Sequence, residues 1–98
     1  MTVYVDAAIH PYRGRLYCHL FGEDVVAVHA LAAAVGLTRA GFQAPPRARW
    51  PHYDLSPRYR TRALAAGAVE ADRSTTVRVA RILRAACFFG LQPPPPGV

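Results

Sequence analysis

The sequence contains no lysine or asparagine, and only six acidic residues and two cysteines among its 98 residues. The cysteines, Cys18 and Cys87, lie far apart, and neither has the nearby second cysteine that a zinc-binding pair needs. We therefore predict neither a disulfide scaffold nor a zinc framework, and we expect both cysteines to be small buried apolar side chains. No other metal-ligand motif stands out, and no cofactor is identified.

Long apolar runs are absent as well. No uninterrupted stretch reaches the roughly 18 to 20 residues of a membrane span, and the N-terminus lacks the basic and apolar segments of a signal peptide. We therefore expect a cytoplasmic protein without a membrane partner. Hydrophobic residues make up 52% of the chain and charged residues 18%, a balance that supports a folded core. We predict one globular domain over residues 1–92 and a proline-rich mobile tail over residues 93–98.

The charge balance is strongly basic. All twelve basic residues are arginine, and the formal net charge is +6. Ten of these arginines lie in residues 39–98, so the second part of the chain carries the positive charge. Such a region favours polyanionic partners or phosphate-bearing ligands. Because a GC-rich coding sequence also enriches arginine and alanine together, arginine content alone does not identify a phosphate site.

Hydrophobic periodicity predicts the secondary structure. Alternating apolar residues predict short strands over residues 3–6, 16–21, 39–43 and 68–71, with a turn region over residues 10–14. Three-and-four spacing with capping signals predicts helices over residues 24–36, 56–67 and 74–90. This order predicts an α/β or α+β fold, in which about three helices pack on a small single-layer sheet of three to four short strands.

The third predicted helix is amphipathic. Val79, Ile82 and Leu83 share its apolar face, and arginines share the opposite face. These arginines, together with a basic segment that includes one tryptophan, form a candidate nucleic-acid interface based on phosphate neutralisation and base stacking. The residues of this interface are Arg47, Arg49, Trp50, Arg78, Arg81 and Arg84.

The segment Pro51-His52-Tyr53-Asp54-Leu55 leads directly into the second predicted helix. If it is extended, the two-residue period places His52 and Asp54 on one side and Tyr53 on the other. A carboxylate beside an imidazole holds the tautomer and raises the basicity of the ring, which suits a general base or a metal ligand. In the structural alternative, Asp54 forms an Asx turn, His52 is solvated and Tyr53 packs its ring.

Several segments occur in the order seen in a known family: residues 3–6, 18–21, 41–43, 51–55 and 67–70, with His29 and Arg60. Over residues 1 to about 72 the chain resembles domain of unknown function 4031, a small bacterial and phage family with a His-Tyr-Asp hallmark. Ala7 stands where many relatives carry a second aspartate, and Gly41 where many carry tryptophan. A two-carboxylate metal site at the N-terminus is therefore not predicted, and the resemblance implies no activity.

The candidate site combines the segment around residue 52 with other polar residues. We expect His52, Asp54 and His19 to be catalytic, and Asp6, Tyr53, Arg60 and His29 to bind ligand. His19 faces a groove or solvent if its strand neighbours face the core. Arg60 lies on the same inward-facing side of the second predicted helix as Ala63 and Leu64. Its guanidinium therefore needs a charged partner, either an aspartate or a ligand phosphate. For His29, the structural alternative to ligand binding is a half-buried ring that forms a hydrogen bond with a backbone carbonyl.

Three functions stay open on the sequence alone. The favoured one is a polar-pocket enzyme or ligand-binding protein for a phosphate-bearing small molecule or nucleotide. The alternatives are a homo-oligomeric interaction protein, such as a homodimer, and a basic nucleic-acid-binding module.

Overall fold

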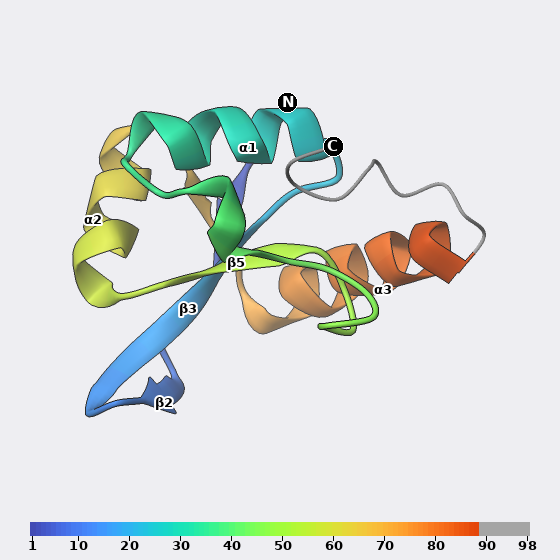
Figure 1. Cartoon of the computed structure of the whole chain (residues 1–98), viewed down its shortest axis with the longest axis horizontal. Helices are drawn as coiled ribbons and strands as arrows, with labels where there is room; N and C mark the ends of the chain where they lie inside the picture. Colours follow the sequence, from blue (N-terminus) through green and yellow to red (C-terminus); the bar gives the residue numbers. More distant parts are fainter. Residues whose placement is uncertain (89–98) are drawn as a thin grey trace.

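The computed structural model describes residues 1–88. In this part of the chain, helices pack around one mixed sheet of six strands (Figure 1). The strands are β1 (Tyr4–Val5), β2 (His10–Tyr12), β3 (Arg15–Phe21), β4 (Phe42–Gln43), β5 (His52–Leu55) and β6 (Val69–Glu70). The helices are α1 (Val25–Ala34), α2 (Pro57–Ala65) and α3 (Arg73–Phe88). The predicted α+β class is confirmed, although the sheet has six strands instead of three to four.

The strand order is β4-β5-β3-β1-β6, and β2 pairs with β3 beside this path. The pairing of β1 with β6 is parallel, and the other pairings are antiparallel. The register places His19 on β3 opposite Asp54 on β5, and Gln43 on β4 opposite His52 on β5. Three neighbouring strands therefore place polar side chains side by side.

The sequence prediction missed the strands β2 and β5. The region before residue 15 was expected to be a turn, but only Arg13 and Gly14 turn, with φ values of 48° and 78°. This tight hairpin returns His10–Tyr12 alongside β3. The segment His52–Leu55 is extended, as considered from the alternation of its side chains. It forms β5, which pairs with β3 on one edge and with β4 on the other.

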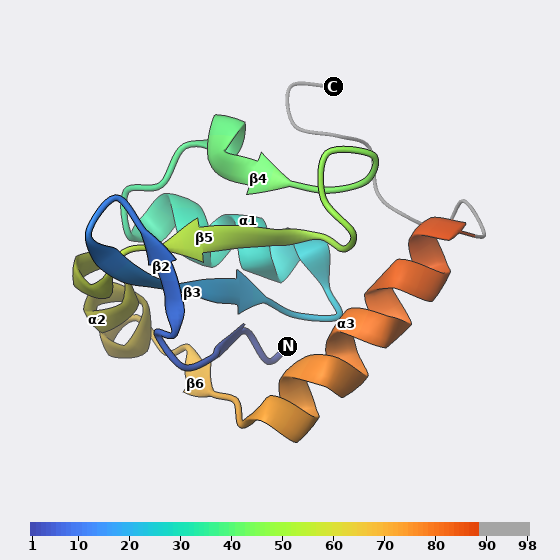
Figure 2. The same cartoon turned by 90° about the horizontal axis from the view of Figure 1, so that it is seen from below.

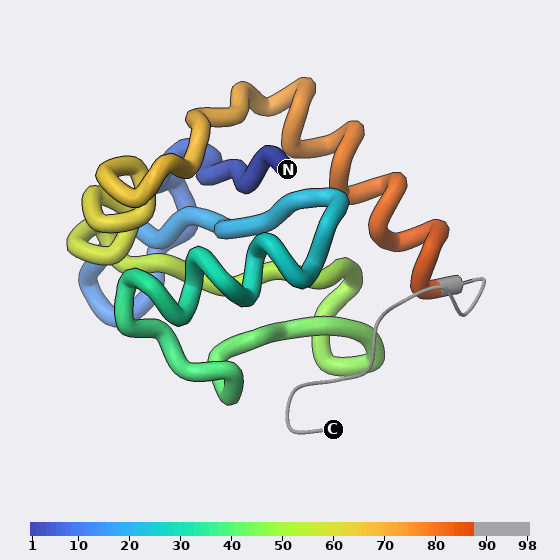
Figure 3. Tube along the Cα trace, turned by 90° about the horizontal axis from the view of Figure 1, so that it is seen from above, coloured from blue at the N-terminus to red at the C-terminus, as the bar shows by residue number. Residues whose placement is uncertain are grey.

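The alternating side chains of the strands divide the sheet into two faces. Val5, Cys18, Leu20, Tyr53 and Leu55 belong to the main core on the face that α1 and α2 cover. Figure 3 shows α1 lying over the sheet on this side, roughly along the direction of β3 and β5. Figure 2 shows the other face, where α3 crosses one end of the sheet and β2 lies in front of β3. The polar side chains described below occupy this second face.

The helix α3 packs on the second face through a small apolar cluster. It begins slightly earlier than predicted, because the Asp72 carboxylate accepts the backbone N–H of Thr75 at 2.7 Å. Val79 and Leu83 are buried, but Ile82 is 44% exposed. The prediction that Ile82 faces the core is therefore wrong, because the contact with the sheet is narrower than the apolar stripe of the helix.

Three remaining expectations concern the tail, the membrane and the cysteines. The predicted tail over residues 93–98 lies outside the described residues. Within residues 1–88, no helix is both long and apolar enough to cross a membrane. Cys18 is fully buried, and burial raises the pKa of its thiol to about 12. As predicted, this side chain acts as a small apolar group, because its thiolate is not populated near neutral pH. Cys87 is only half-buried, so the prediction of a buried side chain is wrong at that position.

Candidate active site

Polar side chains gather on the sheet face opposite α1 and α2. We call this group the polar cluster; its members are Asp6, His10, His19, His52 and Asp54. The two-residue period of β3 and β5 explains the placement, because their apolar residues point into the main core and the residues between them point to the other face. Asp6 follows β1, and His10 comes from the β2 hairpin.

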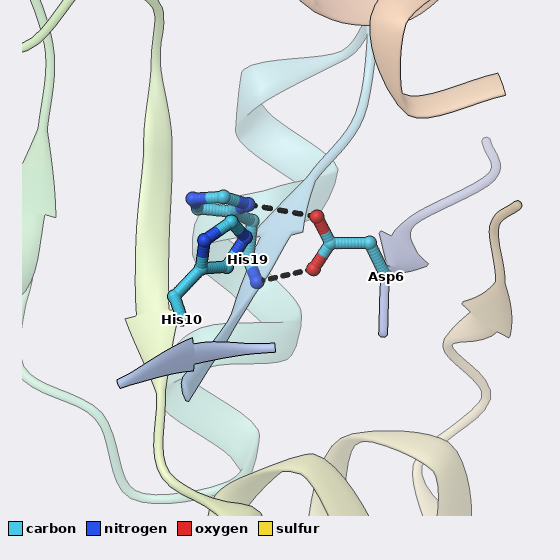
Figure 4. A group of neighbouring side chains, drawn as sticks. All are labelled: Asp6, His10 and His19. Atoms are coloured by element: carbon cyan, nitrogen blue, oxygen red, sulfur yellow. Dashed lines mark hydrogen bonds and ion pairs between the residues drawn. The ribbon is translucent and has the colours of Figure 1, made fainter. Parts of the chain in front are cut away.

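The carboxylate of Asp6 accepts two hydrogen bonds from His19 (Figure 4). The backbone N–H of His19 donates to Oδ1 of Asp6 at 2.6 Å, and Nδ1 of the ring lies 2.7 Å from Oδ2. Burial alone would raise the pKa of Asp6, but the hydrogen bonds from His19 outweigh it and hold that pKa below its ordinary value. Because an ionised carboxylate only accepts, Nδ1 of His19 carries the hydrogen. In the neutral ring, Nε2 then presents a lone pair.

The ring of His52 is fixed in the same tautomer by a different partner. Its Nδ1 lies 2.8 Å from the backbone carbonyl oxygen of Trp50, which can only accept, so Nδ1 donates. The Nε2 of His52 lies 3.4 Å from Oδ1 of Asp54, and the Nε2 of His19 lies 4.0 Å from the same oxygen. Both free ring nitrogens therefore converge on one carboxylate oxygen.

Asp54 completes this convergence. Its Oδ2 accepts a hydrogen bond from the side-chain amide of Gln43, which leaves Oδ1 directed to the rings. A hydrogen bond with His52, which forms when Nε2 of that ring carries a proton, holds the pKa of Asp54 below its ordinary value despite partial burial. The side chain of Asp54 is 40% exposed, whereas that of His52 is 9% exposed, so solvent reaches the site from the Asp54 side. The structure does not show the Asx turn, because Asp54 lies within a strand.

Aromatic rings surround the two histidines. The Trp50 ring packs against His52 and His19, with centroid distances of 4.6 and 5.1 Å, and it also meets Phe21 at 5.3 Å. The His10 ring lies 4.4 Å from that of His19. These contacts limit the rotation of the rings. They also make Trp50 part of the wall of the site. The nucleic-acid alternative assigns this ring to base stacking, but in the structure the ring already packs against His19, His52 and Phe21.

A pocket of about 360 Å³ adjoins the polar cluster. It lies between the chain around β2 and the first turns of α3, and its walls are mainly apolar. The lining residues are Asp6, Ala7, Ile9, His10, His19, Ala71, Asp72, Arg73, Thr76 and Val77. Its volume suits a small organic ligand, and Arg73 contributes a cation to its wall.

Two predicted ligand-binding residues lie on the other face of the sheet. Tyr53 is buried in the main core, and its hydroxyl oxygen is 2.6 Å from Nδ1 of His29. Burial lowers the pKa of His29, and its buried Nε2 has no hydrogen-bond partner in the described part of the chain. The structural alternative for His29 named a backbone carbonyl as its partner, and the structure shows a tyrosine hydroxyl in that role. The structure does not bring this pair to the polar cluster, because Tyr53 alternates with His52 and Asp54 along β5.

Arg60 is the remaining predicted ligand-binding residue. Its Nε donates to the main-chain carbonyl oxygen of Asp6 at 3.0 Å, and its terminal NH2 group donates to Glu70 at 3.0 Å. The expected ion pair with the carboxylate of Asp6 or Asp54 does not form. Arg60 instead ties α2 to the end of β1, which positions Asp6.

The arginines of the nucleic-acid alternative are exposed, as predicted. Arg78 lies 3.7 Å from Glu23 in an exposed ion pair. His10 and Gln43, by contrast, were not among the predicted site residues. Only the resemblance over residues 41–43 hinted at Gln43, and nothing in the sequence pattern indicated that the β2 hairpin would bring His10 over His19.

The family model for "Protein of unknown function (DUF4031)" matches residues 3–83. The chain belongs to this family. The match confirms the resemblance and extends it past residue 72 into α3 of this DUF4031 protein. Comparison with the curated proteins and with the solved structures found no match. Because the family description assigns no activity, function has to be inferred from the site itself.

Proposed function

We propose that this DUF4031 protein is a hydrolase that acts on a phosphate-bearing small molecule or nucleotide. One observation carries the proposal: His19 and His52 both direct Nε2 toward Oδ1 of Asp54. These three atoms lie within 4.8 Å of one another. That span is short enough for a single water molecule to contact all of them. A water held against a basic imidazole nitrogen is the usual arrangement for general-base hydrolysis.

The tautomers assign a role to each group. The Trp50 carbonyl occupies Nδ1 of His52, so Nε2 is the nitrogen available to accept a proton from water. The water oxygen forms a new bond to phosphorus, and the bond from phosphorus to the leaving alkoxide breaks. The proton on His52 then passes to the alkoxide, which leaves as an alcohol. Asp54 orients the water and stabilises the transient imidazolium.

The surroundings favour a small phosphate ester as substrate. The adjoining pocket of about 360 Å³ shares Asp6, His10 and His19 with the polar cluster, and it is where we place the organic part of the substrate. Its apolar wall suits the organic part of an ester, and Arg73 can pair with a phosphate oxygen. The net charge of +6 attracts anions to the chain as a whole.

The proposal is tested by phosphate release from the full chain. The substrates are p-nitrophenyl phosphate, bis(p-nitrophenyl) phosphate and a set of nucleoside phosphates, in buffer containing a mixture of divalent cations. The His52→Gln variant should lower kcat/KM by about 10²- to 10⁴-fold, the usual contribution of a general base. The matched control is Arg58→Gln, at an exposed position on α2, which should keep wild-type activity. No turnover by the wild type, or equal turnover by folded His52→Gln, would overturn the proposal.

A further inference from the structure

The convergence point is surrounded by electron-pair donors. The carboxylate of Asp6 contacts the His19 ring, and the carboxylate of Asp54 lies beside both the His19 and the His52 rings. His19 and His52 have already used their Nδ1 hydrogens on other partners. A cation would be attracted to this point, and it would offset the repulsion that the nearby carboxylates exert on a phosphate group.

We propose that Nε2 of His19, Nε2 of His52 and Oδ1 of Asp54 bind one divalent transition-metal ion of the zinc type. Two imidazoles and one carboxylate form a typical set for a catalytic ion, and they leave coordination positions open. Metal binding depends only on the geometry of these three side chains and not on the proposed hydrolase function. Only the use of the ion in phosphate chemistry rests on the proposed hydrolase function. With the ion bound, the lone pair on Nε2 of His52 would serve as a metal ligand, so the metal-bound water, and not His52 acting as a base, would supply the nucleophile.

The spacing of the ligand atoms, which all lie within 4.8 Å of one another, is compatible with such an ion. Tetrahedral zinc with bonds of about 2.0 to 2.2 Å places its ligand atoms roughly 3.3 Å apart. Nε2 of His52 and Oδ1 of Asp54 are 3.4 Å apart, which matches this spacing. Nε2 of His19 is 4.0 Å from the same oxygen, so a small rotation of the ring closes the set.

Each proposed ligand side chain also forms a hydrogen bond through its second polar atom, the one that does not face the ion. Asp6 accepts from the other ring nitrogen of His19, and the Trp50 carbonyl accepts from that of His52. The side-chain amide of Gln43 donates to the second oxygen of Asp54. Such outer partners are typical of metal sites, where they fix the tautomer and orientation of each ligand. Polar side chains on a solvated surface would not require all three of these hydrogen bonds.

A second group of metal-binding residue types, Asp6, His10 and His19, overlaps the first. In that group, Nδ1 of His19 carries a hydrogen and therefore has no lone pair to offer. Both oxygens of Asp6 already accept hydrogen bonds from His19. The geometry therefore favours the set built on the two Nε2 atoms, and Asp6 is assigned the role of a positioning residue.

An ion at this point supplies what the site lacks for phosphate chemistry. Its positive charge offsets the carboxylates and attracts a phosphate oxygen into an open coordination position. It also lowers the pKa of a bound water to about 7, which provides a nucleophile near neutral pH. The partial exposure of Asp54 gives the ion a route of entry.

Metal binding is tested by calorimetric titration of the full chain after dialysis against a chelator. Zn²⁺ and Co²⁺ should each bind with one ion per chain, and the absorption bands of Co²⁺ should indicate mixed nitrogen and oxygen ligands. Mg²⁺ should bind at least about 100-fold more weakly, because it prefers oxygen ligands in an octahedral arrangement. No saturable Zn²⁺ binding by the folded wild type would overturn the proposal.

Variants then locate the ion. His52→Gln and Asp54→Asn should each weaken Zn²⁺ affinity by more than about 100-fold, whereas loss of an outer partner in Asp6→Asn should cost about 10- to 100-fold. His10→Gln tests the competing group. The matched control is Glu23→Gln, at an exposed carboxylate outside the polar cluster, which should keep wild-type affinity. Circular dichroism verifies that each variant is folded. Wild-type affinity in His52→Gln, or a loss in His10→Gln without one in Asp54→Asn, would overturn the assignment.

The two proposals fail in different ways. A chain that binds Zn²⁺ at these residues but turns over no phosphate ester overturns the hydrolase and supports the metal site. A chelated chain that hydrolyses esters at the wild-type rate, with no Zn²⁺ binding, overturns the metal site and supports the hydrolase.

Discussion

The carboxylate of Asp6 accepts both the backbone N–H and the ring N–H of His19, at 2.6 and 2.7 Å. The first bond ties the end of β1 to β3 beyond their paired residues. The second determines which ring nitrogen of His19 is free to act. One buried carboxylate therefore links the stability of the sheet to the chemistry of the polar cluster.

Replacement of Asp6 by asparagine should destabilise the fold. The asparagine oxygen can satisfy one donor of His19, but its NH2 group then faces the other donor in a partly buried position. The free energy of unfolding should fall by about 1 to 3 kcal/mol, measured by urea denaturation. The control is Asp24→Asn at the N-cap of α1, which should change stability by only a few tenths of a kcal/mol, because asparagine caps helices about as well. Equal effects of the two variants would contradict this prediction.

Acid should remove the stabilisation that the charge of Asp6 provides. Because the pKa of Asp6 is lower in the folded chain than its ordinary value of 3.8, the unfolded chain takes up this proton first as the pH falls. The contribution is therefore present at neutral pH and is lost as the pH falls below about 4, through the folded pKa. The difference in unfolding free energy between wild type and Asp6→Asn should shrink in that range. A difference that stays constant from neutral to acid pH would show that the charge is unimportant.

Replacement of Asp54 by asparagine should separate function from stability. The side chain is 40% exposed and does not support the core, so the free energy of unfolding should change by less than about 1 kcal/mol. Loss of its charge should lower kcat/KM for phosphate esters by at least about 100-fold, because the site loses its carboxylate ligand and its partner for His52. Thermal unfolding and phosphate release on one preparation measure both effects. Full activity of the Asp54→Asn variant would show that Asp54 has no role in the site.

Replacement of Tyr53 by phenylalanine should show the opposite pattern. It removes the hydrogen-bond partner of Nδ1 of buried His29, whose Nε2 already lacks a partner in the described part of the chain. The free energy of unfolding should fall by about 1 to 3 kcal/mol, whereas the kcat/KM of the folded variant should be retained. Tyr12→Phe, at an exposed tyrosine, is the control and should change stability by less than about 0.5 kcal/mol. Loss of catalysis without loss of stability would return Tyr53 to the ligand-binding residues that the sequence suggested.

Local pattern in the sequence was sufficient to locate all three helices and four of the six strands. It also predicted that His19 faces away from Cys18 and that Tyr53 faces away from its two neighbours. These features follow from side-chain periodicity and capping, which act over a few residues and are therefore readable in the chain itself. The sequence pattern does not reveal the hairpin of β2, because residues 10–14 have the composition of one continuous turn region although only Arg13 and Gly14 turn.

Only the tertiary structure decided which residues meet. The pairing of β3 with β5 places Asp54 opposite His19, and the pairing of β4 with β5 brings Gln43 to Asp54. Likewise, Arg60 pairs with Glu70 and the Asp6 backbone, and not with either predicted carboxylate. Strand register depends on contacts between segments far apart in the chain, and these contacts leave no mark in the spacing of neighbouring residues. The convergence of two Nε2 atoms on one carboxylate is therefore a property of the sheet and not of any single motif.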